Sequence, residues 1–168
     1  MDAKTLKDLK DAFAGESQAN RRYLAFSKKA EEENLPGVAL FFKAIAEAET
    51  IHALRHFKLY GLGSTLENLK EAAKGENYEV TMMYPGFKAD ADKAKEKGAS
   101  MSFNGALQAE KEHEKMYLDA IQKVSEGEDV VDVQKVSVCS VCGYTVIGDA
   151  PDECPICKAK QEAFIEFT

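Results

Sequence analysis

The chain has 168 residues, of which 45% are apolar and 30% charged, so it is long enough for one packed domain with a small appendage. Its net charge of −7 argues against nucleic acid or an anionic membrane surface as a partner. No apolar run approaches the ~18 residues needed to span a bilayer, and residues 1–13 lack the apolar core of a signal peptide. We therefore expect a cytoplasmic protein with no nucleic-acid partner and no membrane partner.

Residues 1–125 show the apolar periodicity of long helices. The first helix is expected from about residue 4 to residue 33, where the Asn-Leu-Pro-Gly sequence of residues 34–37 breaks it. A second helix should continue to about residue 60. The residues expected to point inward from this second helix are Val38, Phe41, Phe42, Ile45 and Leu59.

After the second helix, Ser64 and Glu67 have the spacing of a capping box, which predicts a short connecting helix. A third long helix is expected at residues 75–97, with a kink at Pro85, and a fourth at residues 99–125. Four long helices with one long connection between the second and third are typical of a bundle with a crossover. The expected fold class is therefore mainly α, a four-helix bundle.

Beyond residue 127 the helical period ends. Residues 127–134 are expected to form a linker, and the remaining sequence is rich in Val, Gly, Pro and Cys without helical spacing. We therefore predict two domains: a helical bundle at residues 1–134 and a small cysteine domain at residues 135–168.

Charged residues recur on the stripes that should be buried, where an unpaired charge is costly. The first and third helices carry glutamates, and the second and fourth each carry a Glu-x-x-His sequence, whose two side chains share one helix face. In chain order these residues are Glu16, then Glu49 and His52, then Glu76 and Glu79, then Glu110 and His113.

The order of these residues is an internal repeat, with 33 residues between Glu16 and Glu49 and 34 between Glu76 and Glu110. One Glu-x-x-His on a helix is usually a solvated pair. Two, each preceded by a glutamate at a matched distance, match the ligand pattern of di-iron carboxylate bundles. Carboxylates with a few imidazoles suit iron or manganese. The sequence therefore predicts a two-metal site inside the bundle.

Three further residues lie near the expected ligands. His56 is four residues from His52, a spacing that also occurs in zinc pairs, but we expect it at the surface or beside the ligands. Tyr23 and Tyr84 are either ordinary core aromatics or hydrogen-bond partners of the ligand carboxylates.

All four cysteines lie in the last 30 residues, as two C-x-x-C pairs: Cys139 with Cys142, and Cys154 with Cys157. In a reducing cytosol such pairs indicate a tetrahedral thiolate site for zinc or iron rather than disulfides. Spacing alone would favour a structural zinc ribbon. A redox-active iron pair on the same chain favours iron, because zinc has no redox chemistry.

The whole chain resembles rubrerythrin. The resemblance rests on AFAGESQANRRYLAF, AEAETIH, GENYEVTMMYPGF and AEKEHEK around the glutamates, and on VCSVCGY and CPIC around the cysteines. It implies a ferritin-like four-helix bundle followed by a rubredoxin-like domain. It also implies bundle iron ligands at Glu16, Glu49, His52, Glu76, Glu79, Glu110 and His113, and one further iron on the four cysteines, with zinc as a possible substitute.

The resemblance further implies a peroxidase that reduces hydrogen peroxide in oxidative-stress protection. Electrons would come from an external donor such as a reductase or rubredoxin, and the protein would be a homodimer. The residues expected to take part in catalysis are Glu79, His52, Tyr23 and Tyr84, with Glu79 exchanging for His52 on one iron upon reduction. The alternatives are a ferroxidase or iron-storage protein of the ferritin type and a simple electron carrier. The cysteines favour the peroxidase, because a ferroxidase takes its electrons from ferrous iron and needs no relay.

Two details carry expectations of their own. Many rubrerythrins have glycine after the last cysteine, where this chain has Lys158, so the turn is expected to differ while the ligands stay.

Glu110 and Val124 are 14 residues apart, about 21 Å along a helix. Unless the linker folds straight back, the cysteine domain should therefore lie far from its own bundle site and pass electrons to a partner chain.

Overall fold

The structure is a computed structural model that describes residues 1–130 and 133–168. It divides into two compact units, Met1–Leu62 and Gly63–Thr168, and each is described by itself. The linker predicted at residues 127–134 contains Val131 and Asp132, which lie outside the described residues. None of the described helices is both long and apolar enough to cross a membrane.

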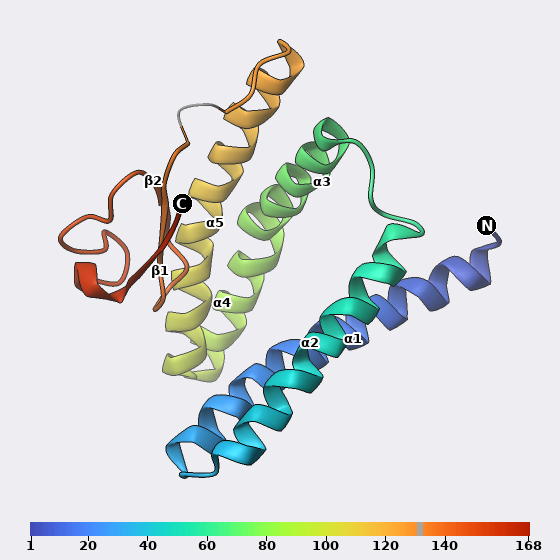
Figure 1. Ribbon diagram of the computed structural model, residues 1–168. Coiled ribbons are helices and arrows are strands. Elements are labelled where there is room, and N and C mark those ends of the chain that lie inside the picture. Colours follow the sequence, from blue (N-terminus) through green and yellow to red (C-terminus); the bar gives the residue numbers. More distant parts are fainter. Residues whose placement is uncertain (131–132) are drawn as a thin grey trace. The chain divides into compact units, whose positions relative to one another are not determined.

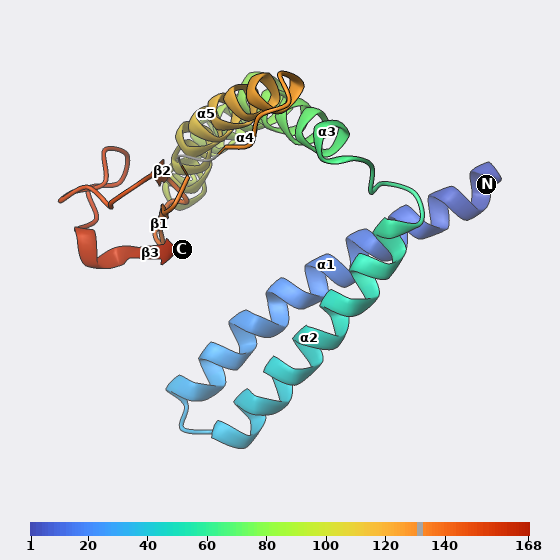
Figure 2. The same ribbon diagram turned by 45° about the horizontal axis from the view of Figure 1, so that its top comes forward.

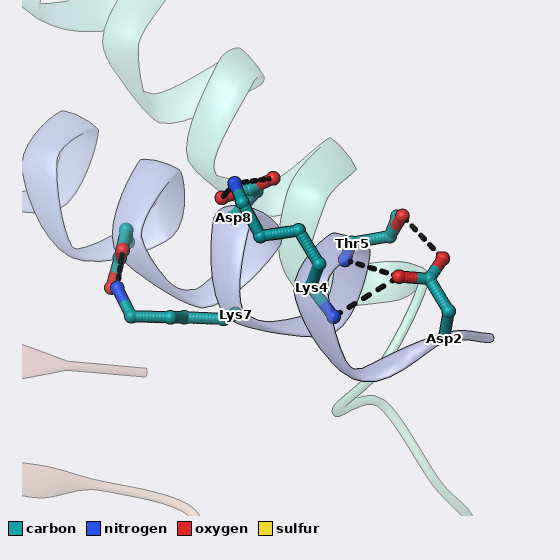
Figure 3. Close-up of polar contacts among 6 residues, drawn as sticks. Asp2, Lys4, Thr5, Lys7 and Asp8 are labelled. Atoms are coloured by element: carbon teal, nitrogen blue, oxygen red, sulfur yellow. Dashed lines mark hydrogen bonds and ion pairs between the residues drawn. The ribbon is translucent and has the colours of Figure 1, made fainter.

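The first unit is a hairpin of two long helices, α1 (Ala3–Glu32) and α2 (Pro36–Lys58) (Figure 1). Asp2 caps α1, because its carboxylate accepts hydrogen bonds from the backbone N–H groups of Lys4 and Thr5, each at 3.0 Å (Figure 3). The turn between the helices has Asn34 at a φ of 57° and proline at the start of α2. Both helices begin and end within a few residues of their predicted bounds.

Small side chains form the seam of this hairpin. The residues buried along it are Ala19, Ala30, Ala39, Ala46 and Ala53. The buried amide of Asn20 donates to the carbonyl of Ala46 at 2.7 Å and to Thr50 Oγ1 at 2.8 Å. Small residues let the two backbones approach closely, and the amide satisfies polar groups in the seam.

Of the five residues predicted to point inward from α2, only one is packed within this unit. Phe42 does pack inward, with its ring centroid 5.5 Å from that of Phe26 and 6.2 Å from that of Tyr23. The other four remain exposed: Val38, Phe41, Ile45 and Leu59. A two-helix hairpin buries only one face of α2, and these four residues lie on its other face.

The second unit begins with one continuous helical segment in place of the two separate helices predicted. It comprises α3 (Thr65–Tyr78), a π-helical turn η1 (Glu79–Met83) and α4 (Tyr84–Ala94). The capping box is confirmed: Ser64 N–H donates to Glu67 Oε2 at 2.8 Å, and the Ser64 hydroxyl caps the helix. The helix that it opens does not stop before residue 75. The predicted long connection is therefore wrong, and only residues 59–64 lie between α2 and α3.

The π-helical turn lies directly before Pro85, where a kink was predicted. Tyr84 N–H donates to the carbonyl of Glu79, five residues earlier. Proline at the second position of α4 has no N–H to continue the α-helical ladder, and a π turn is a common local solution. Such turns are frequent at functional sites, and this one starts at a predicted metal ligand.

The last helix, α5 (Lys97–Ser125), packs along α3 and α4 and is followed by a small antiparallel sheet. The strands are β1 (Val136–Cys139), β2 (Thr145–Ile147) and β3 (Phe164–Phe167), in the order β2-β1-β3. Val138 pairs with Thr145, and Cys139 pairs with Phe164. The sheet lies beside α5 in both views (Figures 1 and 2), and β2 contacts that helix. This contact positions the cysteine domain.

Candidate metal centres

The first unit brings together Glu16 of α1 with Glu49 and His52 of α2, the N-terminal cluster. One ligand atom from each lies within 4.8 Å of the others. His52 Nδ1 is 3.2 Å from Glu49 Oε2. Glu16 and Glu49 are close enough to share a proton, which raises the pKa of Glu16 and lowers that of Glu49. A cation between the two carboxylates would replace this proton.

The second unit brings together Glu76 of α3 with Glu110 and His113 of α5, the C-terminal cluster, again with ligand atoms within 4.8 Å. His113 Nδ1 is 2.5 Å from Glu110 Oε2. Burial and the neighbouring Glu110 carboxylate raise the pKa of Glu76 to about 7. Carboxylates and an imidazole held this close, at an electrostatic cost, fit a hard divalent metal.

Glu79 and Tyr84 lie beside the C-terminal cluster but outside its tight group. Burial first, then Glu110, raises the pKa of Glu79. Burial, then the carboxylates of Glu79, Glu110 and Glu76, raises the pKa of Tyr84. Tyr84 is therefore within electrostatic reach of three predicted ligands and stays protonated, able to donate a hydrogen bond.

The other two residues predicted near the ligands belong to the first unit. Tyr23 packs against the rings of Phe26 and Phe42, which fits the core-aromatic alternative. His56 is half-buried and close enough to Glu16 to favour its charged form, as expected of a residue beside the ligands. The exchange of Glu79 for His52 stays a prediction, since the two residues lie in different units.

The four cysteines form a compact thiolate group. Their sulfurs all lie within 4.8 Å of one another. The Sγ atoms of Cys139 and Cys157 are 3.6 Å apart, as are those of Cys142 and Cys154. A tetrahedral site with metal–sulfur bonds of ~2.3 Å has sulfurs about 3.8 Å apart, so the four residues fit zinc or iron.

Backbone N–H groups surround these sulfurs. Burial alone would raise the pKa of Cys154, but hydrogen bonds from the backbone of Cys157 and Ile156 and from the neighbouring thiols lower it to about 7. The Tyr144 N–H points to Cys142 in the same way, although burial dominates and raises that pKa. Hydrogen bonds that stabilise a thiolate also stabilise metal–thiolate bonds.

The two C-x-x-C turns have the same backbone hydrogen bond, and in one of them a residue other than glycine has a positive φ. Gly143 N–H donates to Cys139 O at 2.9 Å, and Lys158 N–H donates to Cys154 O at 3.0 Å. Gly143 has a φ of 81° and Lys158 a φ of 65°. The turn after the last cysteine therefore keeps the geometry that glycine favours, but a lysine adopts it.

Replacing Lys158 with glycine is expected to stabilise the cysteine domain by about 1 kcal/mol, because a residue with a Cβ pays roughly that much in the left-handed region. The matched Gly143→Lys change should destabilise it by a similar amount. Denaturant unfolding, followed by loss of the thiolate–metal absorption, measures both. Equal midpoints for Lys158→Gly and the native protein would contradict the expectation.

One hydrogen bond joins the cysteine domain to the C-terminal cluster. Thr145 Oγ1 donates to the carbonyl of Gly143 at 2.9 Å, and His113 Nε2 lies 2.8 Å from Thr145 Oγ1. Because the threonine hydroxyl is directed to the Gly143 carbonyl, we assign the proton of His113 to Nε2, which then donates to Thr145 Oγ1. Its Nδ1 is then left as the metal-binding atom, facing Glu110.

The cysteine ligands also lie close to α5. A Cβ built on Gly105 would be 3.6 Å from the Cβ of Cys142, and one built on Gly143 would be 3.9 Å from that of Ala109. The chain after α5 thus folds straight back. This is the case that the distance argument excepted, so that argument does not apply: the cysteine domain lies against the C-terminal cluster of its own chain, and transfer to a partner's site stays a prediction.

Sequence reasoning missed Thr145 as part of the site. A threonine three residues after Cys142 has no pattern that marks it, and only the packing of β2 on α5 reveals its contact with His113.

Comparison with known proteins gives a consistent result. The sequence profile described as Rubrerythrin matches residues 7–121, and that described as Rubrerythrin, rubredoxin-like domain, matches residues 138–165. The chain is 37% identical over 180 residues to Rubrerythrin-2 of Clostridium acetobutylicum, covering 98% of this chain and 97% of the relative. Nigerythrin of Nitratidesulfovibrio vulgaris is 34% identical over 184 residues, covering 97% and 86%. Both alignments are longer than the 168 residues of this chain, so these relatives contain internal residues that it lacks.

Among solved structures, a mixed-valence state of nigerythrin has a TM-score of 0.57 and 34% identity, covering 97% of this chain and 86% of the other. The fully reduced, all-ferrous state of nigerythrin gives the same TM-score at 33% identity. The predicted fold class, mainly α and ferritin-like with a small rubredoxin-like C-terminal domain, is thereby confirmed. The chain belongs to the rubrerythrin family of iron-binding, di-iron oxidoreductases.

Proposed function

We propose that the protein is a non-haem di-iron peroxidase that reduces hydrogen peroxide to water in the cytoplasm and protects against oxidative stress. The N-terminal and C-terminal clusters together, with Glu79, would hold two irons, and the four cysteines would hold a third. The observation that carries the proposal is the hydrogen bond from His113 to Thr145, which connects the thiolate site to a predicted iron ligand.

The overall reaction consumes one hydrogen peroxide, two electrons and two protons and yields two waters. Irons held by the carboxylates and by the cysteines would supply the redox chemistry for this reduction, and the four cysteines would hold the iron that accepts electrons from outside. The electrons originate from an external donor, such as a reductase or rubredoxin. Zinc in the cysteine site would hold the fold but could not carry an electron.

The chain's own groups hold, orient and protonate. Glu16, Glu49, Glu76 and Glu110 are the carboxylates that would hold the metals. Tyr84 keeps its proton because burial and nearby carboxylates raise its pKa. It is therefore the group best suited to hydrogen-bond a ligand carboxylate or a bound peroxide oxygen.

The rates of re-oxidation by two oxidants, measured separately, test the proposal. The iron-loaded protein, reduced anaerobically, is mixed with hydrogen peroxide or with oxygen, and re-oxidation is followed by absorption. We expect peroxide to react much faster than oxygen, and steady reduction of peroxide to water when a donor is supplied. Oxygen-driven ferrous oxidation that outpaces peroxide turnover would support the ferroxidase alternative instead.

A further inference from the structure

Within the first unit, α2 has an apolar face that α1 does not cover. In the helices, the buried hydrophobic residues of the described chain are all alanines, and the larger side chains remain accessible. On α2, Phe41 is 64% exposed and Ile45 36%. They lie four residues apart and lead to Glu49 and His52 on the same stripe. The uncovered face and the N-terminal cluster are therefore one surface, and the missing cover must also complete the metal site.

The connection between the units is too short for the chain to cover itself in a ferritin-like bundle. Such bundles have one long crossover, so the second and third helices run in the same direction. Glu49 lies nine residues before the end of α2, and Glu76 lies eleven residues after the start of α3. A shared metal site requires Glu49 and Glu76 to lie at the same height along the bundle axis. In two parallel helices the end of α2 is then about 30 Å from the start of α3 along that axis, at ~1.5 Å per residue.

The residues available cannot span that separation. From Lys58 to Thr65 there are seven Cα–Cα steps, which reach about 25 Å when fully extended. Much of this segment is not extended: Gly61 N–H donates to Phe57 O at 2.8 Å, and Gly63 N–H donates to Asn68 Oδ1 at 2.9 Å.

We propose that two copies of the chain exchange units, so that Met1–Leu62 of one copy packs against Gly63–Thr168 of the other. This rests on the proposed function, since it assumes that the two clusters form one di-iron site. Each dimer then has two sites. Each site takes Glu16, Glu49 and His52 from one chain, and the C-terminal cluster with its adjacent cysteine domain from the other. The short connection prevents closure within one chain, and the twofold exchange covers both faces.

Complementation between variants tests the exchange. Chains carrying Glu49→Ala and Glu110→Ala, each with a different affinity tag, are co-expressed, and the mixed dimer is isolated through both tags. Neither parent should bind the iron pair. In the mixed dimer one site receives both lesions and the other none, so we expect one iron pair per dimer. If every site were built within one chain, the mixed dimer would bind no pair.

A reciprocal pair is the matched control. Native chains are combined with chains that carry both Glu49→Ala and Glu110→Ala. Exchange puts one lesion in each site, so this dimer should bind no iron pair, whereas sites within one chain would leave one pair intact. Bound iron per dimer is the readout, and the colour of the cysteine iron reports that each chain has folded.

The possible failures are separable. A native protein that binds no iron pair would refute the proposed function. A native protein that binds the pair as a monomer, or mixed dimers with the opposite pattern, would refute only the exchange. A single-chain bundle with α2 and α3 antiparallel would give that opposite pattern.

Discussion

Replacing Glu110 with alanine is expected to abolish binding of the iron pair and to lower peroxide turnover at least ~100-fold, while the red cysteine iron remains. Glu110 contacts His113 and raises the pKa of Glu76, so it lies at the centre of the C-terminal cluster. Loss of a ligand should exceed the 10- to 100-fold effect usual for groups that only support ligands. Glu49→Ala should have the same effect from the first unit, where Glu49 lies between Glu16 and His52.

The loss should not reflect unfolding. Alanine favours helix formation, and removal of Glu110 relieves the repulsion that raises the pKa of Glu76. The metal-free variant should therefore be at least as stable as the metal-free native protein. Glu112→Ala and Glu47→Ala, exposed positions on the same two helices, are the matched controls. Iron analysis and thermal unfolding measure the outcome, and a Glu110→Ala protein with both bundle irons would disprove the ligand assignment.

Loading the cysteine site with zinc is expected to stop the enzyme after a single turnover. The four sulfurs lie within 4.8 Å of one another, with two pairs 3.6 Å apart, and such a group accepts either metal. The fold and the contact with α5 should therefore be kept while the electron relay is lost. A variant with all four cysteines changed to serine should stall in the same way. The first peroxide added to pre-reduced protein should still react at the native rate.

The Thr145→Val variant tests the path between the two metal centres. It removes the oxygen 2.8 Å from His113 Nε2 but keeps the four cysteines. We expect re-reduction of the iron pair to slow by roughly 10-fold, with the visible spectrum of the cysteine iron unchanged. Ser140→Ala, an exposed change in the same domain, is the control. Stopped-flow absorption separates the steps, and sustained native turnover by the zinc-loaded protein would overturn the relay.

The sequence identified residues that the structure brings close together. The repeat of Glu and Glu-x-x-His predicted one two-metal site, and the structure brings its residues together as two clusters: Glu16, Glu49 and His52 in the first unit, and Glu76, Glu110 and His113 in the second. The two C-x-x-C pairs predicted one thiolate group. Such patterns are readable because residues three or four apart share a helix face, and paired knuckles have few alternative uses.

Sequence reasoning failed where local signals conflict. Gly75 was read as the start of a helix, but a Cβ there would contact nothing within 4 Å, and α3 continues through it. The capping box of Ser64 therefore opens a long helix. The predicted long crossover is therefore replaced by the short connection of residues 59–64. This short connection raises the question of which chain completes each site.

What the sequence determined by itself is the set of chemical groups and the helices that carry them, because helix periodicity and ligand spacing are local properties. The tertiary structure decided which groups meet. It placed Thr145 on His113, began a π turn at Glu79, and left Phe41 and Ile45 exposed on the face that carries Glu49. These depend on packing between residues far apart in the chain, and no local pattern encodes that packing.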